Sequence, residues 1–303
     1  MILDAVFTKV SREFRIPNGP PLIIIGMHRS GTSMVTRILR QAGGYFGYRL
    51  DPNSEAIISL RLNHSFLSYA NASWDFFPRG FRTEDLSRNF KVVLCLLSNK
   101  NLLWSHFFEF FGRADAEERL LRRHEYQLPL LSVTEILNFR NQTHTMVNDA
   151  VPFWGWKDPR TTLTLSVWLK IFPDAKVVHV VRSGIDVALS LWRRCHECGE
   201  GAPRCLSLPY CFSLWGRYVE EGCKWRSLGE DRYIEVRYED LLCDPIEGLK
   251  PLLSFIGVAP ENALVLSKLV RSDRMARGSL KCVEEVVERA KGSKVFRDLG
   301  SDK

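Results

Sequence analysis

The chain has 303 residues, 45% of them hydrophobic and 25% charged, and a formal net charge of +7, with 42 Lys and Arg against 35 Asp and Glu. This composition is that of a globular protein, and no apolar run approaches the roughly 20 residues that a membrane-spanning helix needs. The first 21 residues lack the continuous apolar stretch of a signal peptide, so we expect a cytoplasmic location. The excess positive charge suits an anionic ligand. Lys and Arg are spread along the chain without a dense basic stripe, so no nucleic-acid partner is expected.

Short β-branched runs alternate with helical patterns along the chain. The predicted strands are residues 21–25, 176–181 and 232–237, and the predicted helices are about 34–42, 184–194, 245–255 and 261–270. This alternation predicts an α/β fold, a P-loop-type parallel β-sheet flanked by helices on both faces. We expect one domain over 1–303, with a core of about 20–260 and a C-terminal helical tail of about 261–303. Ligands of such folds bind beyond the carboxyl ends of the strands.

The first strand leads into a glycine-rich loop, GMHRSGTS (26–33). Gly26 and Gly31 keep the spacing of G-x-x-x-x-G-K-[ST], but Thr32 stands where a nucleoside triphosphatase has Lys. Glycines permit turns that aim N–H groups inward, and the following helix adds its positive end, so the loop predicts an anion site. Without the Lys it is poorly suited to β- and γ-phosphates with Mg²⁺. The structural alternative is a tight turn that requires small residues.

A second candidate phosphate site follows the strand 176–181. Arg182 lies at the carboxyl end of this strand, and Ser190 lies eight residues later in the predicted helix. An arginine fork and a hydroxyl that meet at one point bind phosphate well. The alternative is a salt bridge for Arg182 and a packing role for Ser190. Two phosphate sites on neighbouring strands fit a nucleotide that is phosphorylated at two separated positions.

Four blocks together resemble the superfamily of sulfotransferases that use 3′-phosphoadenosine 5′-phosphosulfate (PAPS), in the bacterial branch related to the carbohydrate and tyrosylprotein sulfotransferases. The blocks are GMHRSGTS (26–33), GWKDPRTTL (155–163), FPDAKVVHVVRSGIDVALS (172–190) and VRYEDLLCDP (236–245). The resemblance implies that PAPS is the sulfuryl donor. It assigns the 5′-phosphosulfate to Arg29, Ser30, Gly31, Thr32 and Ser33, and the 3′-phosphate to Arg182 and Ser190. It also suggests that Tyr238 lies near adenine, although this residue would equally suit a core aromatic that opens the next helix.

The same resemblance assigns the catalytic residues. Arg29 and Lys157 would stabilise the leaving group, although a Lys before a turn is often only solvated. Glu55 best matches the acidic position of the general base, and His64 is the next candidate. A Glu in the first turn of a helix often only compensates the helix dipole.

No metal is expected to be required for the reaction. Cys195, Cys198, Cys205 and Cys211 resemble a zinc knuckle, but the last two are six positions apart in the sequence, wider than the usual spacing. An irregular insertion near the acceptor is the favoured interpretation of this segment. The aromatic-rich stretch 74–111 fits either core helices or the lining of an acceptor pocket.

The sequence therefore predicts an enzyme that moves the sulfuryl group of PAPS to a hydroxyl or amine by in-line displacement. A small molecule, a carbohydrate or a peptide would serve as acceptor, and the oligomeric state is left open. Two alternatives are a P-loop nucleotide kinase and a catalytically inactive nucleotide-binding or scaffold protein of the same fold.

Overall fold

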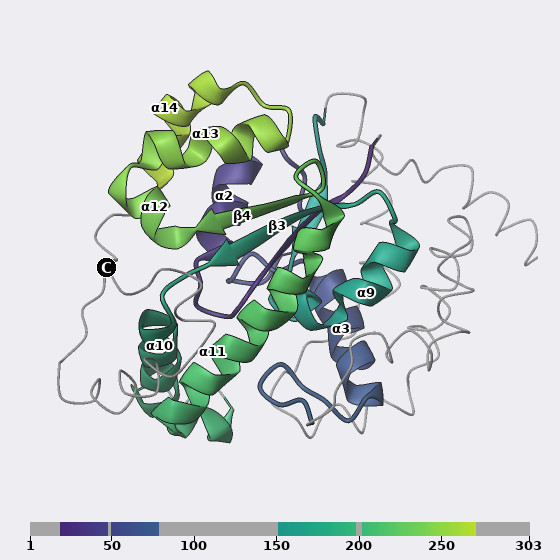
Figure 1. Ribbon diagram of the computed structural model, residues 1–303, viewed down its shortest axis with the longest axis vertical. Helices are drawn as coiled ribbons and strands as arrows, with labels where there is room; N and C mark the ends of the chain where they lie inside the picture. Colours follow the sequence, from purple (N-terminus) through teal and green to yellow (C-terminus); the bar gives the residue numbers. More distant parts are fainter. Residues whose placement is uncertain (1–18, 48–49, 79–150, 198–201, 271–303) are drawn as a thin grey trace, which may run out of the picture. The chain divides into compact units, whose positions relative to one another are not determined.

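The computed structural model describes residues 19–47, 50–78, 151–197 and 202–270 (Figure 1). The chain divides into two compact units, Met1–Gly19 with Ser87–Val151, and Pro20–Leu86 with Pro152–Lys303. All the helices and strands reported below belong to the second unit. The single domain over 1–303 stays a prediction, and the aromatic stretch lies outside the described residues from position 79 onward.

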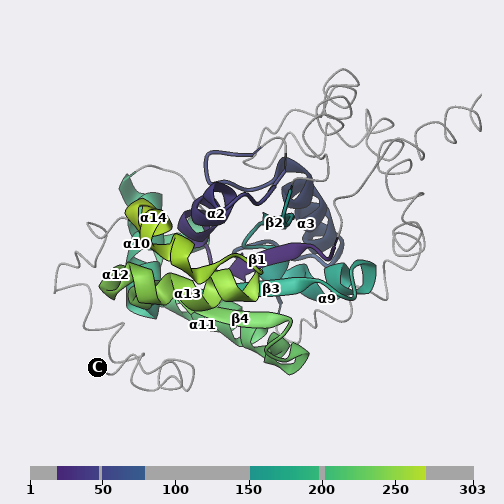
Figure 2. The same cartoon turned by 90° about the horizontal axis from the view of Figure 1, so that it is seen from above.

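A parallel sheet forms the centre of the second unit. Its strands are β1 (Leu22–Gly26), β2 (Gly155–Lys157), β3 (Lys176–Val181) and β4 (Tyr233–Arg237). They lie in the order β2-β1-β3-β4, which Figure 2 shows from above, and each neighbouring pair is parallel. Ile24 lies opposite Lys157 on one side and Val178 on the other. Parallel pairing brings the carboxyl ends of all four strands to the same edge.

Helices follow each strand. Their bounds are α2 (Thr32–Gln41), α3 (Ile57–Tyr69), α9 (Thr161–Ile171), α10 (Gly184–Glu197), α11 (Leu208–Cys223), α12 (Tyr238–Cys243), α13 (Pro245–Phe255) and α14 (Ala263–Leu266). Short 3-10 turns are η1 (Pro203–Leu206), η2 (Lys224–Leu228), η3 (Pro260–Asn262) and η4 (Ser267–Leu269). None of the helices within the described ranges is long and apolar enough to cross a membrane.

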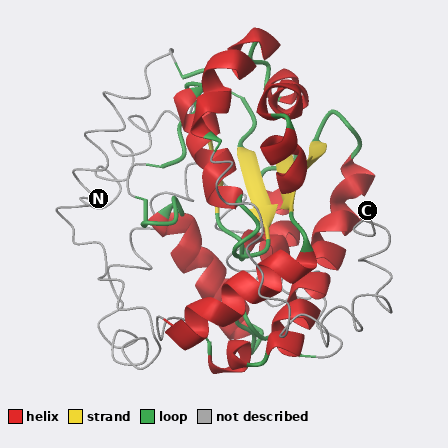
Figure 3. Cartoon of the chain, turned by 90° about the vertical axis from the view of Figure 1, so that its left-hand side faces the viewer, coloured by secondary structure: helices red, strands yellow, loops and turns green. Residues whose placement is uncertain are grey.

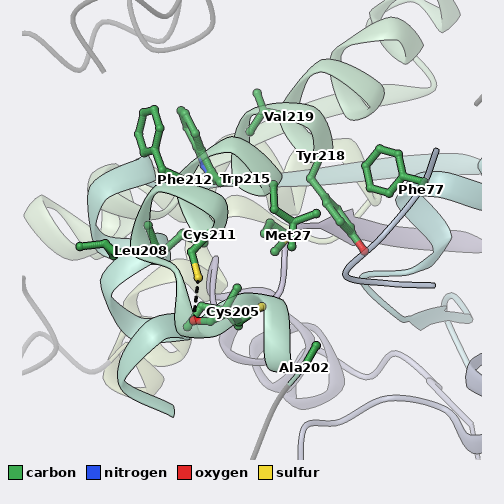
Figure 4. Close-up of a cluster of buried hydrophobic side chains, with 14 of the residues drawn as sticks. Met27, Phe77, Ala202, Cys205, Leu208, Cys211, Phe212, Trp215, Tyr218 and Val219 are labelled. Atoms are coloured by element: carbon green, nitrogen blue, oxygen red, sulfur yellow. Dashed lines mark hydrogen bonds between the residues drawn. The ribbon is translucent and has the colours of Figure 1, made fainter. Parts of the chain in front are cut away.

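Two buried clusters of apolar side chains join the helices to the sheet. One cluster combines β1, β3 and β4 with α2, α12, α13 and α14. The other combines the ends of β1 and β3 with α10 and α11, and its side chains are drawn in Figure 4. Figure 3 shows the strands between helices. The predicted α/β fold, a parallel sheet with helices on both faces, is confirmed.

The segment with the clustered cysteines is helical from residue 203 onward, so the expectation of an irregular insertion is wrong there. Ser207 caps α11 by accepting a hydrogen bond from the backbone N–H of Tyr210 at 3.4 Å. Buried side chains then recur every three or four residues along the helix, at Leu208, Cys211, Phe212, Trp215, Tyr218 and Val219. This is the spacing of an amphipathic helix, and three of these residues, Phe212, Trp215 and Tyr218, are aromatic.

The strand order places a switch point between β1 and β3 at the carboxyl edge of the sheet. The chain leaves β1 toward β2 on one side, and it leaves β3 toward β4 on the other side. Such a switch point is where open α/β sheets bind ligands.

Candidate functional site

The glycine-rich loop lies at this switch point, directly after β1. Gly26 has φ +140°, and a Cβ added there would lie 2.4 Å from the carbonyl oxygen of Val180. Gly31 has φ +99°, and Arg29 between them also has a positive φ, of 73°. Ser30 closes the turn by donating from Oγ to the carbonyl oxygen of Met27 at 2.7 Å. The loop turns back on itself and delivers the chain into the first turn of α2.

Arg182 and Ser190, the residues of the predicted second phosphate site, contact this loop. Arg29 donates from Nε to the Ser190 hydroxyl oxygen at 2.9 Å, and Arg182 donates from one terminal nitrogen to the carbonyl oxygen of Arg29 at 3.3 Å. These contacts join the loop after β1 to the loop and helix after β3. The two groups of residues that the sequence assigned to separate phosphates therefore lie side by side.

Arg182 is held in place by three neighbours. Its guanidinium carbon lies 4.5 Å from the centre of the Tyr238 ring, and its terminal nitrogen lies 3.5 Å from the Asp186 carboxylate. The indole N–H of Trp215 donates to the carbonyl oxygen of Arg182 at 3.1 Å. Nε of Arg182 is buried and has no hydrogen-bond partner among the described residues. A buried donor without a partner is costly, and a bound anion would satisfy it.

Tyr238 packs between the two loops. It is 4% exposed, and a Cβ added at Gly31 would lie 2.2 Å from its ring carbon Cδ2. The Arg182 guanidinium lies over the same ring. Tyr238 thus serves as a core aromatic at the start of α12, and its contact with adenine stays a prediction.

A buried ion cluster lies at the carboxyl end of β2. Lys157 donates to Oε1 of Glu55 at 3.0 Å, and Arg160 donates to Oε2 of Glu55 at 3.0 Å and to Oδ1 of Asp158 at 2.9 Å. Lys157 is 1% exposed, so the alternative of a solvated Lys is wrong. Lys157 also donates to the carbonyl oxygen of Asn53 at 2.9 Å. Two cations and two carboxylates therefore offset one another without solvent.

Glu55 lies just before α3 rather than in its first turn. Its backbone N–H donates to Oδ1 of Asp51 at 2.6 Å, which fixes the segment that carries it. Burial alone would raise the pKa of the Glu55 carboxyl, but the charges of Lys157 and Arg160 outweigh burial and hold the pKa below its ordinary value. Glu55 is therefore an ionised carboxylate at neutral pH.

Comparison with known proteins identifies the family. The model of the sulfotransferase family matches residues 20–262, which contain the glycine-rich loop, Arg182 and the ion cluster. The chain belongs to the sulfotransferase family.

Two relatives extend this finding. The protein-tyrosine sulfotransferase of Drosophila melanogaster is 33% identical over 113 residues, which cover 36% of this chain and 22% of that protein. The chain therefore matches about a fifth of the length of that relative. The crystal structure of a sulfotransferase from Alicyclobacillus acidocaldarius is similar with a TM-score of 0.51 at 14% identity, covering 93% of this chain and 95% of that one. This likeness supports the same fold.

The sequence did not predict that Asn63, Asp158 and Arg160 belong to the ion cluster. Asn63 donates to Oδ2 of Asp158 and to Oγ1 of Thr161, both at 2.8 Å. Asp158 in turn accepts from the backbone N–H of Arg160 at 2.9 Å. The available signal was the sequence Lys-Asp-Pro-Arg after a strand, in which only the Lys was considered. His64 follows Asn63 on α3 and is half-buried, and its role as the alternative base stays a prediction.

The structure describes three of the four cysteines that resemble a zinc knuckle, and all three are buried. Cys195, Cys205 and Cys211 pack in the apolar cluster of Figure 4, where Cys211 donates from Sγ to the carbonyl oxygen of Cys205 at 3.3 Å. Hydrogen bonding to Cys211 and burial raise the pKa of the Cys205 thiol, which opposes the thiolate that zinc needs. Cys198 lies outside the described residues, so zinc binding by the four cysteines stays an open alternative.

One other group of metal-type ligands occurs in the part of the chain that the structure describes. His179, Cys223 and Glu235 have ligand atoms within 4.8 Å of one another. However, Nδ1 of His179 is hydrogen-bonded to the Tyr233 hydroxyl at 2.7 Å, and the Glu235 carboxylate is 2.6 Å from a nitrogen of Arg226. We therefore interpret these three residues as part of the packing between β3, β4 and the end of α11.

Proposed function

We propose that this sulfotransferase takes the sulfuryl group from PAPS and transfers it to a hydroxyl or amine acceptor. The observation that carries the proposal is the contact between two anion-binding loops on adjacent strands, Arg29 to Ser190 at 2.9 Å. A nucleotide with phosphates at both its 5′ and 3′ positions needs two such loops. A nucleoside triphosphate would need only the first loop, with a Lys and Mg²⁺ to hold its phosphates.

In this proposal the 5′-phosphosulfate lies over the glycine-rich loop. Arg29, Ser30, Gly31, Thr32 and Ser33 provide a guanidinium, hydroxyls and the backbone N–H groups at the start of α2. The helix of ten residues directs its positive end toward the same place. The 3′-phosphate is bound by Arg182 and Ser190, and the adenine lies toward Tyr238.

The transfer is an in-line displacement with a loose transition state, in which positioning and charge stabilisation supply most of the rate. The acceptor oxygen or nitrogen attacks sulfur as the bond to the bridging phosphate oxygen breaks. Arg29 and Lys157 stabilise the charge that develops on this oxygen, and Glu55 accepts the acceptor's proton. These side chains supply the positive charge themselves, so we expect no metal requirement.

The acceptor is a small molecule, a carbohydrate or a peptide, and no nucleic acid is expected. The relative named protein-tyrosine sulfotransferase favours a phenolic hydroxyl, as in a tyrosine peptide, for the first trials.

A transfer assay tests the proposal. The protein is incubated with sulfur-labelled PAPS and panels of phenols, tyrosine peptides and sugars, and labelled product and released 3′,5′-ADP are measured. Lys157→Met should lose at least about tenfold in turnover, whereas Lys250→Met, at an exposed pair with Glu247, should retain it. Transfer of the γ-phosphate of ATP with Mg²⁺ would instead support a kinase. Tight binding of 3′,5′-ADP without turnover on any panel would support an inactive nucleotide-binding protein.

A further inference from the structure

Glu55 is held by two cations that act on different oxygens. Lys157, the last residue of β2, donates to Oε1, and Arg160, from the turn before α9, donates to Oε2. Each contact measures 3.0 Å, and all three side chains are nearly inaccessible to solvent. Because the contacts are separate, one cation can leave Glu55 while the other remains.

Asp158 holds Arg160 in place. Both its backbone N–H and one terminal nitrogen donate to Oδ1 of Asp158 at 2.9 Å. Oδ2 of Asp158 accepts from Asn63, whose own carbonyl oxygen accepts from Thr164 at 2.6 Å and from the Trp168 indole at 2.7 Å. Every link of this chain is buried, so the guanidinium has little freedom to move.

Lys157 differs from Arg160 because it lies beside the glycine-rich loop, where the donor is proposed to bind. Its Nζ and the hydroxyl of Ser33 both donate to one acceptor, the carbonyl oxygen of Asn53, at 2.9 and 2.6 Å. An anion over the glycine-rich loop would therefore compete with Glu55 for Lys157. An ammonium on a flexible four-carbon stem can exchange partners more readily than a planar guanidinium whose one terminal nitrogen bridges Glu55 and Asp158.

We propose that Arg160 is a positioning residue, which keeps Oε2 of Glu55 in place while the bound donor draws Lys157 away from Oε1. This inference rests on the proposed function. Oε1 then becomes the atom that takes the acceptor's proton. In the transfer step the proton moves from the acceptor oxygen or nitrogen to Oε1, the new bond forms to sulfur, and the bond from sulfur to the phosphate oxygen breaks. The electron pair of that bond leaves on 3′,5′-ADP, whose charge Arg29 and Lys157 offset.

The two cations beside Glu55 control its pKa. While Lys157 and Arg160 both contact it, the pKa of Glu55 stays below its ordinary value. Departure of one cation raises this pKa, so donor binding makes the carboxylate a stronger base, and the remaining guanidinium keeps it ionised. Other titratable groups also face this cluster. They are Asp51 before α3, Asp158 in the turn that carries Arg160, His28 in the glycine-rich loop and Tyr218 on α11.

Proton uptake on donor binding measures this change without any acceptor. PAPS is titrated into the protein by calorimetry in buffers of different ionisation enthalpy over a range of acidic pH. The wild type should take up more protons than Glu55→Gln, because the pKa of Glu55 rises when Lys157 leaves. The difference between the two curves isolates Glu55 from titration of the nucleotide's own 3′-phosphate.

Arg160→Gln should move the uptake to higher pH by about one unit or more, the usual effect of removing an opposite charge at this distance. Arg160→Lys should give a smaller shift in the same direction, because the ammonium keeps the positive charge but lacks the planar, rigid geometry of the guanidinium. Arg226→Gln, which breaks an ion pair with Glu235 elsewhere, is the matched control and should leave the curve unchanged. Should Arg160→Gln fail to fold, Arg160→Lys and Asn63→Ala carry the test, since neither removes the positive charge.

The outcomes separate the inference from the proposed function. No binding of PAPS to the wild type would contradict the proposed function itself. Binding with equal proton uptake in the wild type and Glu55→Gln would overturn the exchange of Lys157, with the PAPS proposal intact. A Glu55-dependent uptake that stays at the same pH in every folded Arg160 and Asn63 variant would overturn the role of Arg160.

Discussion

Replacing Gly31 by Ala should disrupt the packing of Tyr238 between the glycine-rich loop and Arg182. The new methyl group would lie 2.2 Å from Cδ2 and 2.6 Å from Cε2 of Tyr238, and the backbone there has φ +99°. A left-handed conformation costs an L-residue about 1–2 kcal/mol, and overpacking a buried position costs about 1–3 kcal/mol more. We therefore expect the free energy of unfolding to fall by about 2–5 kcal/mol.

Two other glycines separate these contributions in urea denaturation. Gly229 has φ +82° with no atom within 4 Å of an added Cβ, so Gly229→Ala should show the backbone cost alone. Gly216 lies inside α11 with open space around it, so Gly216→Ala should stabilise the protein by about 0.5–1 kcal/mol. Tyr238→Ala combined with Gly31→Ala should be less destabilising than the sum of the two changes, because the ring that the methyl group meets is gone. A loss for Gly31→Ala no larger than that for Gly229→Ala would refute the packing of Tyr238 against the loop.

Three further predictions concern pH, packing and metal. Burial, with the charge of Arg226, lowers the pKa of His179 to about 3, so protons favour the unfolded chain. The stability is complete above the ordinary histidine pKa of about 6.5 and should fall below it by up to about 1.4 kcal/mol per pH unit, a slope that His179→Gln should reduce in denaturation at several pH values. Tyr218→Phe removes the hydrogen bond to the carbonyl oxygen of Trp74, 2.7 Å long, and should cost about 1 kcal/mol in urea unfolding; an unchanged midpoint would argue against this contact. Sulfuryl transfer and the melting temperature should both survive EDTA, and ATP should not replace PAPS; loss of either property on chelation would show that a metal is needed.

The strands with strong side-chain patterns were predictable from the sequence. The β-branched run of β3 was predicted at its observed bounds, residues 176–181, and the glycine spacing located the loop after β1. Strand β2 has three residues, which is too short for any periodicity to be recognised. Helix α11 was missed because its segment was interpreted as an irregular insertion, although its buried residues have amphipathic spacing.

The contacts of the site were harder to predict than its members. Glu55 and Arg160 are 105 residues apart, and nothing local indicates that an Arg after Asp-Pro is buried. Lys157 was assigned from a resemblance, but its pairing with Glu55 depends on how α3 and β2 pack. Pairings between distant segments are determined by the three-dimensional fold, and periodicity carries no information about them.

Nucleotide binding to the wild type and to Arg182→Ala tests the central claim most directly. We measure the affinities of 3′,5′-ADP and 5′-AMP for both proteins by calorimetry at one ionic strength. The wild type should prefer 3′,5′-ADP, and Arg182→Ala should reduce this preference by about 2 kcal/mol, or about thirtyfold, because the charge-assisted contact with the 3′-phosphate is lost. Equal affinities of the wild type for the two nucleotides, or a preference that Arg182→Ala leaves intact, would contradict the second phosphate site and with it the assignment of PAPS as donor.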